Sequence, residues 1–251
     1  MTTALGKRVA LISGGTYGIG REITLKFAEH GYAVAAFGID PAQTAATVES
    51  LRSKGLEGYV LTGDVSDPAD VRGIVGEVMA REQQIDVLVN NAAVMIRGTL
   101  LETTKEQWDR AFAVNIGGMF LLTREVLPHM IARHRGAIVN VASGSGYGGP
   151  GRLAYCCSKG AVFPFTVSIA QEYAASGIRA NTVVPGNVFP TGMTERDADT
   201  PERKRKLERA ALASPAGRVN TPRDIANAVF WLASDESETV SGSTLEVMIR
   251  T

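Results

Sequence analysis

The chain has 251 residues and no formal net charge at pH 7, because 26 Lys and Arg balance 26 Asp and Glu. We interpret the length as one α/β domain over residues 1–251, and the balanced charge offers no basic surface for nucleic acid or an anionic membrane. The first residues show no basic stretch followed by a long apolar run, and no segment approaches ~20 unbroken apolar residues, so we expect a cytoplasmic protein.

Short apolar runs rich in β-branched residues alternate with longer segments of helical period along the whole chain. The predicted strands are Val9–Ile12, Ala33–Phe37, Tyr59–Thr62, Val87–Val89, Ile138–Val141, Ala180–Val184 and Thr244–Val247. The predicted helices are Ile19–Glu29, Ala42–Arg52, Ala69–Glu82, Glu106–His134, Ala154–Ala175 and Arg223–Ala233. Apolar strands that alternate with helices predict a doubly wound, seven-stranded parallel sheet with helices on both faces.

A glycine-rich turn follows the first strand, with Gly14, Gly18 and Gly20 in the spacing Gly-x-x-x-Gly-x-Gly. Glycines let the backbone turn tightly and bring N–H groups close to a pyrophosphate at a helix N-terminus. An ordinary tight turn is the alternative, but the position after the first strand favours a dinucleotide site. The cofactor-contacting residues that we expect in this turn are Gly14, Thr16, Tyr17, Gly18, Ile19 and Gly20. A P-loop is excluded because no Gly-Lys-Ser/Thr follows.

Polar residues also stand at the ends of the third and fourth strands. Asp64, followed by Val65, could accept a hydrogen bond from an adenine amino group, although a turn or capping Asp is nearly as good an interpretation. Asn91 is followed by two alanines, and small residues beside an amide allow a ribose to pass closely. The alternative is an amide that satisfies its own loop.

These three pieces, in this order, resemble the short-chain dehydrogenase/reductase family, and the resemblance covers essentially the whole chain. The family motifs read Thr-Gly-x-x-x-Gly-x-Gly, Asp-Val and Asn-Asn-Ala-Gly. Here Ser13 replaces the Thr and Ala93 replaces the last Gly. The resemblance implies a Rossmann-like domain, a nicotinamide cofactor, a small-molecule alcohol or ketone as substrate, and a homo-oligomer (tetramer or dimer) built through the two long helices.

The end of the second strand bears on the choice between NAD and NADP. An acid there accepts from the ribose hydroxyls, and a base there pairs with a 2′-phosphate. Residues 37–41 hold Asp40 and no Lys or Arg, and Tyr17 stands where NADP-dependent relatives often have a base. We therefore favour NAD, with helix capping by Asp40 as the alternative role.

Tyr155 and Lys159 are four residues apart, which places them on one face of a helix. A free phenol titrates near pH ~10, and a cation within roughly 4–6 Å lowers that pKa by about 1–3 units. We predict that Tyr155 is the general acid and base, and that both residues contact the nicotinamide riboside. The spacing alone is common on amphipathic helices, so its place after the fifth strand carries the prediction.

The resemblance adds three further site residues. Ser143, at the end of the fifth strand, would polarise the substrate oxygen, with Ser145 as an alternative. Asn115 would hold a water in the proton-relay path, unless it is a buried amide bonded to a backbone carbonyl. The backbone of Val188 would bond the nicotinamide carboxamide, although the Thr expected two residues later comes one place late, at Thr191.

A polar, charged segment follows the sixth strand, and we predict that residues 190–214 form a substrate lid. Its run Arg203–Lys206 is interpreted as the solvated face of a short helix rather than a phosphate site. Met95, Arg97 and Tyr147 are expected to shape the substrate pocket.

The remaining motifs are interpreted structurally. Cys156 and Cys157 are neighbours, too few for a four-ligand zinc site, so we expect reduced thiols and no bound metal. Pro164 should kink its helix or perturb the packing of that helix. Two competing functions are a catalytically silent, cofactor-binding regulator and a sugar-nucleotide epimerase. The presence of Asn115, Ser143, Tyr155 and Lys159 disfavours the first, and the lack of room for a second domain disfavours the other.

Overall fold

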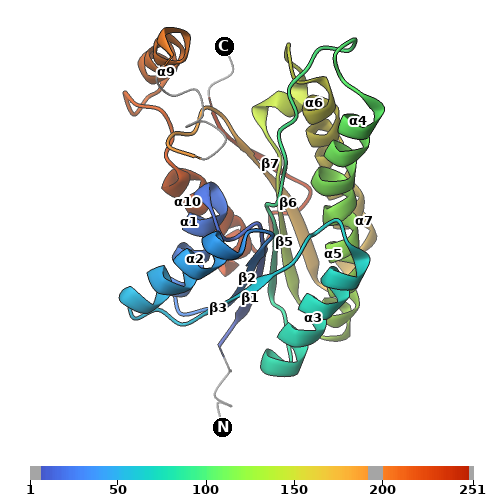
Figure 1. Cartoon of the computed structure of the whole chain (residues 1–251). Helices are drawn as coiled ribbons and strands as arrows, with labels where there is room; N and C mark the ends of the chain where they lie inside the picture. Colours follow the sequence, from blue (N-terminus) through green and yellow to red (C-terminus); the bar gives the residue numbers. More distant parts are fainter. Residues whose placement is uncertain (1–6, 192–199, 249–251) are drawn as a thin grey trace.

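Seven parallel strands form one sheet in the order β3-β2-β1-β4-β5-β6-β7 in the computed structural model, which describes residues 7–191 and 200–248 (Figure 1). The strands are β1 (Val9–Ser13), β2 (Ala33–Gly38), β3 (Tyr59–Thr62), β4 (Val87–Asn90), β5 (Gly136–Val141), β6 (Ile178–Pro185) and β7 (Thr244–Val247). Each predicted strand is present, and the predicted fold class is confirmed.

Helices cover both faces of the sheet (Figure 1). One face carries α1 (Gly18–Glu29), α2 (Pro41–Ser53) and α10 (Pro222–Ala233), and the other carries α3 (Pro68–Glu82), α5 (Gly118–Ala132) and α7 (Val162–Glu172). The short helices α4 (Lys105–Phe112) and α6 (Leu153–Gly160), and the longer α9 (Pro201–Ala213), lie toward the carboxyl ends of the strands.

Alternate residues of each inner strand feed two apolar cores. Ala10 and Ile12 of β1 pack toward α1 and α10, whereas Val9 and Leu11 pack toward α3, α5 and α7. All five residues of β1 are buried, as is every residue of β5. Burial on both faces explains why these strands are apolar throughout rather than alternating with polar residues.

Both long predicted helices are interrupted in the structure. The segment predicted as Glu106–His134 consists of α4, a π-helical turn at Ala113–Gly117, and α5. The segment predicted as Ala154–Ala175 divides into α6 and α7, with a turn at Ala161 between them. A proline ring clashes with the carbonyl four residues before it, and α6 ends at Gly160, four residues before Pro164. The predicted perturbation by Pro164 is confirmed.

The stretch Leu153–Glu172, spanning α6 and α7, is long and apolar enough to cross a membrane by length and composition, with a mean hydropathy of 1.3 in its most apolar window. Half of that window is buried in the fold. Ile169 and Ala170 pack in the core against β5 and β6, and Lys159 is fully enclosed. Its apolar character is therefore that of a core helix.

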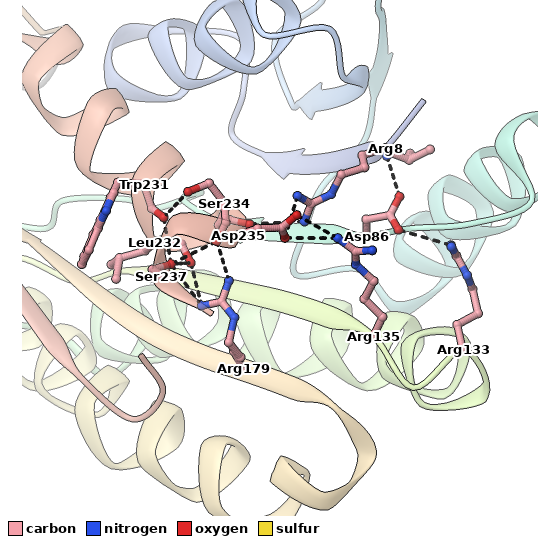
Figure 2. Close-up of polar contacts among 12 residues, drawn as sticks. Arg8, Asp86, Arg133, Arg135, Arg179, Trp231, Leu232, Ser234, Asp235 and Ser237 are labelled. Carbon is pink, nitrogen blue, oxygen red and sulfur yellow. Dashed lines mark hydrogen bonds and ion pairs between the residues drawn. The ribbon is translucent and has the colours of Figure 1, made fainter. Parts of the chain in front are cut away.

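At the amino ends of the strands, acidic and basic side chains tie the sheet to its connections (Figure 2). The buried carboxylate of Asp86 accepts from Val9 N at 2.8 Å and lies 3.4 Å from Arg133. Asp235, which follows α10, accepts from Arg8 and Arg135, each at 3.1 Å. These bonds join β1, the segment before β4, the α5–β5 connection and the end of α10.

Arg179 of β6 closes the C-terminal end of α10 (Figure 2). Its guanidinium donates to the carbonyls of Leu232, Ser234 and Val240 and to Ser237 Oγ. The last carbonyls of a helix have no partner within the helix, and a cation there also suits the helix dipole. Arg179 therefore has a structural role remote from the carboxyl ends of the strands.

A row of buried polar side chains crosses the face under α5 and α7. Asn90 of β4 donates to Thr123 Oγ1 at 3.0 Å and to Asn140 Oδ1 of β5 at 2.8 Å. Asn140 donates to Thr166 Oγ1 of α7 at 2.9 Å, and Thr182 of β6 donates to the same oxygen at 2.8 Å. We call these five residues the polar row. It joins three strands to two helices.

Candidate active site

A cleft of about 2210 Å³ opens at the carboxyl ends of the strands. The strand order reverses between β1 and β4, and in open parallel sheets ligands bind at this point. The predicted site residues that line the cleft are Gly14, Thr16, Tyr17, Gly18, Ile19, Gly20, Asp40, Asp64, Val65, Asn91, Ser143, Tyr155, Lys159 and Val188. Of the residues predicted for the site, Asn115 alone does not line the cleft, and its side chain is fully buried.

The glycine-rich turn has a shape that only glycine permits. Gly14 and Gly18 have φ values of +61° and +53°, in the left-handed region. A Cβ on Gly20 would stand 1.9 Å from the carbonyl oxygen of Gly14. The turn leads directly into α1, so backbone amides at the helix N-terminus face the cleft. This cradle fits the pyrophosphate of a dinucleotide.

Asn91 and Ser13 hold the glycine turn in place. Asn91 Nδ2 donates to the carbonyls of Ser13 and Gly14, at 3.2 and 3.0 Å. Ser13 Oγ accepts from the backbone N–H groups of Asn91 and Ala92, at 3.1 and 3.2 Å. The Asn91 side chain thus fixes the backbone of the glycine turn. Ser13 supplies the hydroxyl group that a Thr supplies in the family motif.

At the end of β2, Asp40 caps α2. Its Oδ1 accepts from Ala42 N at 2.8 Å and Gln43 N at 3.4 Å, as the alternative interpretation of this residue anticipated. The last strand residue, Gly38, lies against Thr16, and a Cβ there would stand 2.3 Å from Thr16 Oγ1. An acidic side chain at position 38 would therefore require Thr16 to move.

Asp64 bonds Ser66 within its own turn, as the alternative interpretation of this residue anticipated, and it also contacts Arg110, which the sequence did not point to. Its Oδ1 accepts from Ser66 N and Oγ, at 2.9 and 2.6 Å, and its Oδ2 lies 3.1 Å from Arg110. Burial alone would raise the pKa of Asp64, but the bonds from Ser66 and Arg110 outweigh it and hold the pKa below its usual value. Asp64 is therefore a carboxylate at neutral pH, held in a fixed orientation.

Ser143, Tyr155 and Lys159 meet on the wall of the cleft formed by β5 and α6. Ser143 and Tyr155 both line the cleft, and the Ser143 side chain is near enough to the phenol to favour a lower pKa for it. Lys159 Nζ donates to the Val141 carbonyl at 2.7 Å, and only 1% of the lysine is exposed. The predicted constellation is thus assembled from a strand end and the helix that follows it.

The two titratable groups of this wall are shifted by burial. Burial raises the pKa of Tyr155, and the hydrogen bond from Ser143 and the Arg152 cation oppose that rise without cancelling it. Burial lowers the pKa of Lys159 to about 8. The expectation of a phenol pKa lowered by Lys159 is therefore wrong for the chain by itself, because burial raises that pKa and the cation that opposes the rise is Arg152.

Asn115 lies in the π-helical turn and is fully buried. Its Oδ1 accepts from Val94 N at 2.8 Å, and its Nδ2 donates to Val94 O at 3.0 Å and Ser158 Oγ at 2.9 Å. Ser158 Oγ in turn donates to the Tyr155 carbonyl at 3.0 Å. The structure thus gives Asn115 the bonding of the alternative interpretation, a buried amide on backbone groups, and links it to the helix that carries Tyr155.

The segment after β6 also contributes residues to the lining of the cleft. Val188 forms a β-bridge with Asn220, and the late Thr191 lines the cleft close to Gly18. Part of the predicted lid, residues 192–199, lies outside the described residues. The rest of it includes α9, where Lys204 and Arg205 are exposed as expected and Arg209 and Ala213 line the cleft, among others.

Met95, Arg97 and Tyr147, which were predicted to shape a substrate pocket, also line the cleft. Tyr147 donates to Glu246 Oε1 at 2.6 Å and stacks on Phe163 with ring centroids 4.9 Å apart. Sequence reasoning missed Arg152, which also lines the cleft. Its position three residues before Tyr155 can be read from the sequence, but the unbonded Nε that distinguishes it cannot.

The two cysteines, Cys156 and Cys157, follow Tyr155 directly on α6. Cys156 is buried and Cys157 is exposed, and neither forms a disulfide. In the part of the chain that the structure describes, no three His, Cys, Asp or Glu side chains gather as a metal site would require.

Comparisons with known proteins agree on one family. A family model described as short chain dehydrogenase matches residues 8–202. The 3-oxoacyl-[acyl-carrier-protein] reductase FabG of Thermotoga maritima is 38% identical over 245 residues, covering 96% of each chain. The 2-(R)-hydroxypropyl-CoM dehydrogenase of Xanthobacter autotrophicus is 38% identical over 247 residues, covering 95% of this chain and 96% of its own. The crystal structure of an actinorhodin polyketide ketoreductase variant with NADPH has a TM-score of 0.89 at 32% identity, covering 96% of each chain.

Proposed function

The chain belongs to the short chain dehydrogenase family, and we propose that it is a nicotinamide-dependent oxidoreductase that interconverts a secondary alcohol and a ketone. The observation that carries the proposal is the position of Ser143, Tyr155 and Lys159 on one wall of a cleft whose other end is a glycine cradle for a dinucleotide. The dehydrogenases and reductases among its relatives support the same reaction class.

In the direction of ketone reduction, Tyr155 donates its phenolic proton to the carbonyl oxygen, and Ser143 holds that oxygen with its hydroxyl. The raised pKa of Tyr155 keeps the phenol protonated at neutral pH, which suits proton donation. A bound nicotinamide would supply the hydride to the carbonyl carbon, or accept it in the reverse direction. Lys159, buried one helical turn after Tyr155, would supply a cation to stabilise the phenolate that remains.

The glycine cradle would hold the cofactor's pyrophosphate, with Asp64 beside the adenine. For the cofactor's identity we favour NAD. The end of β2 presents Gly38, Ile39 and Asp40 to the cleft, and none of these is basic. The related ketoreductase structure is one with NADPH, so a direct comparison of the two cofactors is needed.

The experiment measures reduced-nicotinamide absorbance with NAD and NADP against a panel of secondary alcohols, sugars and ketones. We expect turnover, a higher kcat/KM with NAD, and a loss of about 10²–10⁴-fold in kcat for Tyr155→Phe with cofactor binding retained. Wild-type protein that binds cofactor but turns over nothing across the panel would instead be a catalytically silent regulator. Full activity in Tyr155→Phe would contradict the assigned role of the phenol.

A further inference from the structure

Arg152 stands at the entry to α6, three residues before Tyr155. It occupies the N-cap position of α6 and forms a β-bridge with Gly98. Two backbone hydrogen bonds hold this bridge, from Gly98 N to Gly151 O at 3.0 Å and from Leu153 N to Gly98 O at 3.1 Å. The arginine is thus fixed at its backbone, on the wall of the cleft that carries the phenol.

In the part of the chain that the structure describes, the guanidinium of Arg152 has no hydrogen-bond or ion-pair partner. Its Nε is out of contact with solvent and makes no hydrogen bond. Across residues 7–191 and 200–248, no carboxylate pairs with it and no carbonyl accepts from it. A buried donor left unsatisfied costs free energy, and a cation left unpaired costs more. Such an arrangement is expected where a ligand supplies the missing acceptor.

Other cations of the cleft contrast with Arg152. Arg110 pairs with Asp64, Arg218 pairs with Asp224 through two hydrogen bonds, and Lys159 donates to the Val141 carbonyl. Their charges or donors are therefore satisfied by the protein itself.

The position of Arg152 identifies which part of a ternary complex it would face. The pyrophosphate cradle is at the start of α1, on the other side of the sheet's switch point, whereas Arg152 belongs to the helix of Tyr155. Its charge is close enough to act on the Tyr155 phenol. A molecule whose carbonyl oxygen meets Tyr155 therefore comes within the field of this guanidinium.

We propose that Arg152 binds an oxyanion carried by the substrate, so that the preferred substrates are ketones or secondary alcohols with a carboxylate, or a comparable oxyanionic group, close to the reacting carbon. The planar guanidinium offers paired N–H donors that match a carboxylate. This inference rests on the proposed function for the identity of the reacting group, and Arg152 acts in it as a specificity-determining residue.

The test is an equilibrium binding measurement that needs no turnover. Protein saturated with oxidised cofactor is titrated calorimetrically with 3-oxobutanoate and 4-oxopentanoate, and with the methyl ester of each. A ketone cannot react with an oxidised cofactor, so binding is observed alone. We expect the better of the two carboxylates to bind at least tenfold more tightly than its ester. In Arg152→Gln, the affinity for the carboxylate should fall at least tenfold, while the affinity for the ester should change less than about threefold.

Two further variants separate charge from geometry. Arg152→Lys should retain part of the carboxylate preference, because it keeps the charge and loses the paired donors. Arg72→Gln, which removes an exposed cation on α3 outside the cleft, should retain all of it. Equal binding of acid and ester, failure of both to bind, or an equal loss of both in Arg152→Gln would overturn the proposal. An Arg152-dependent carboxylate site in a protein without turnover would contradict the proposed function and leave the oxyanion site standing.

Discussion

Lys159 combines the chemical role that we propose for it with an unfavourable position in the core. Its ammonium is enclosed, has one carbonyl acceptor, and has a pKa lowered to about 8. Below that pH, the folded protein keeps a charge out of water, and the free energy of unfolding is reduced accordingly. The residue thus costs stability for the benefit of a cation beside Tyr155.

The pH dependence of stability follows from this shift. Below pH ~8, Lys159 is protonated in both the folded and the unfolded chain, so it contributes no slope. From about 8 to the unfolded value of 10.5, the unfolded chain binds more protons, so the wild type gains stability as pH rises. Relative to Lys159→Met, we expect a gain of about 3 kcal/mol over this range. Urea unfolding of both proteins at several pH values measures this gain in stability. If the stabilities of the two proteins changed in parallel with pH, the prediction would be contradicted.

At the level of single residues, sequence patterns identified which side chains line the cleft better than what those side chains do. Asp40 was expected at the ribose, and it caps α2 with its Oδ1. The pKa argument for Tyr155 failed because burial cannot be read from the spacing of Tyr155 and Lys159. Arg152 was missed because its importance depends on lacking a partner, and that is a property of the folded chain.

Among the elements, the glycine turn makes the strictest demand on residue type. A methyl group at Gly20 would collide with the Gly14 carbonyl, so the turn must open to accept it. By contrast, Gly76 lies exposed within α3, and no atom stands within 4 Å of the place that a methyl group would take there. The same change of Gly to Ala should therefore have opposite effects at the two positions.

We expect Gly20→Ala to lose at least tenfold in affinity for the dinucleotide, because the backbone amides of the cradle are displaced. Gly76→Ala should raise the free energy of unfolding by about 0.5–1 kcal/mol and leave cofactor affinity unchanged, since alanine is the better helix former. Cofactor titration and urea unfolding of both variants provide the comparison. Wild-type affinity in Gly20→Ala would show that the turn tolerates a side chain.

Helix boundaries were the least predictable part of the fold. The apolar period continues from Glu106 to His134, and nothing in it indicates the π-helical turn at Ala113–Gly117. That turn contains Asn115, whose three hydrogen bonds to Val94 and Ser158 come from elements distant in sequence. Where the period is interrupted by a residue with a steric effect, as at Pro164, the sequence predicted the break.

For the whole molecule, we propose self-association through the face that carries α5 and α7. Phe120 on α5 is 47% exposed and Val167 on α7 is 37% exposed, and apolar side chains exposed on one face are typical of interfaces. Light scattering coupled to size exclusion should show a dimer or tetramer. Phe120→Glu should yield a smaller species, whereas Leu212→Glu, on the exposed surface of α9, should not. A monomeric wild type would refute this.

The polar row has a consequence for which fold the chain selects. If α7 slid by one turn along the sheet, Asn140 Nδ2 and Thr182 Oγ1 would lose Thr166 Oγ1, the buried acceptor that α7 supplies to both. Each buried group so orphaned costs about 1–3 kcal/mol, so a misregistered packing would lie several kcal/mol above the native one. The row separates the native state from competing apolar packings that a core of Leu and Val alone would leave nearly equal in energy. Because α6 runs directly into α7, the choice of register also decides where the phenol of Tyr155 stands.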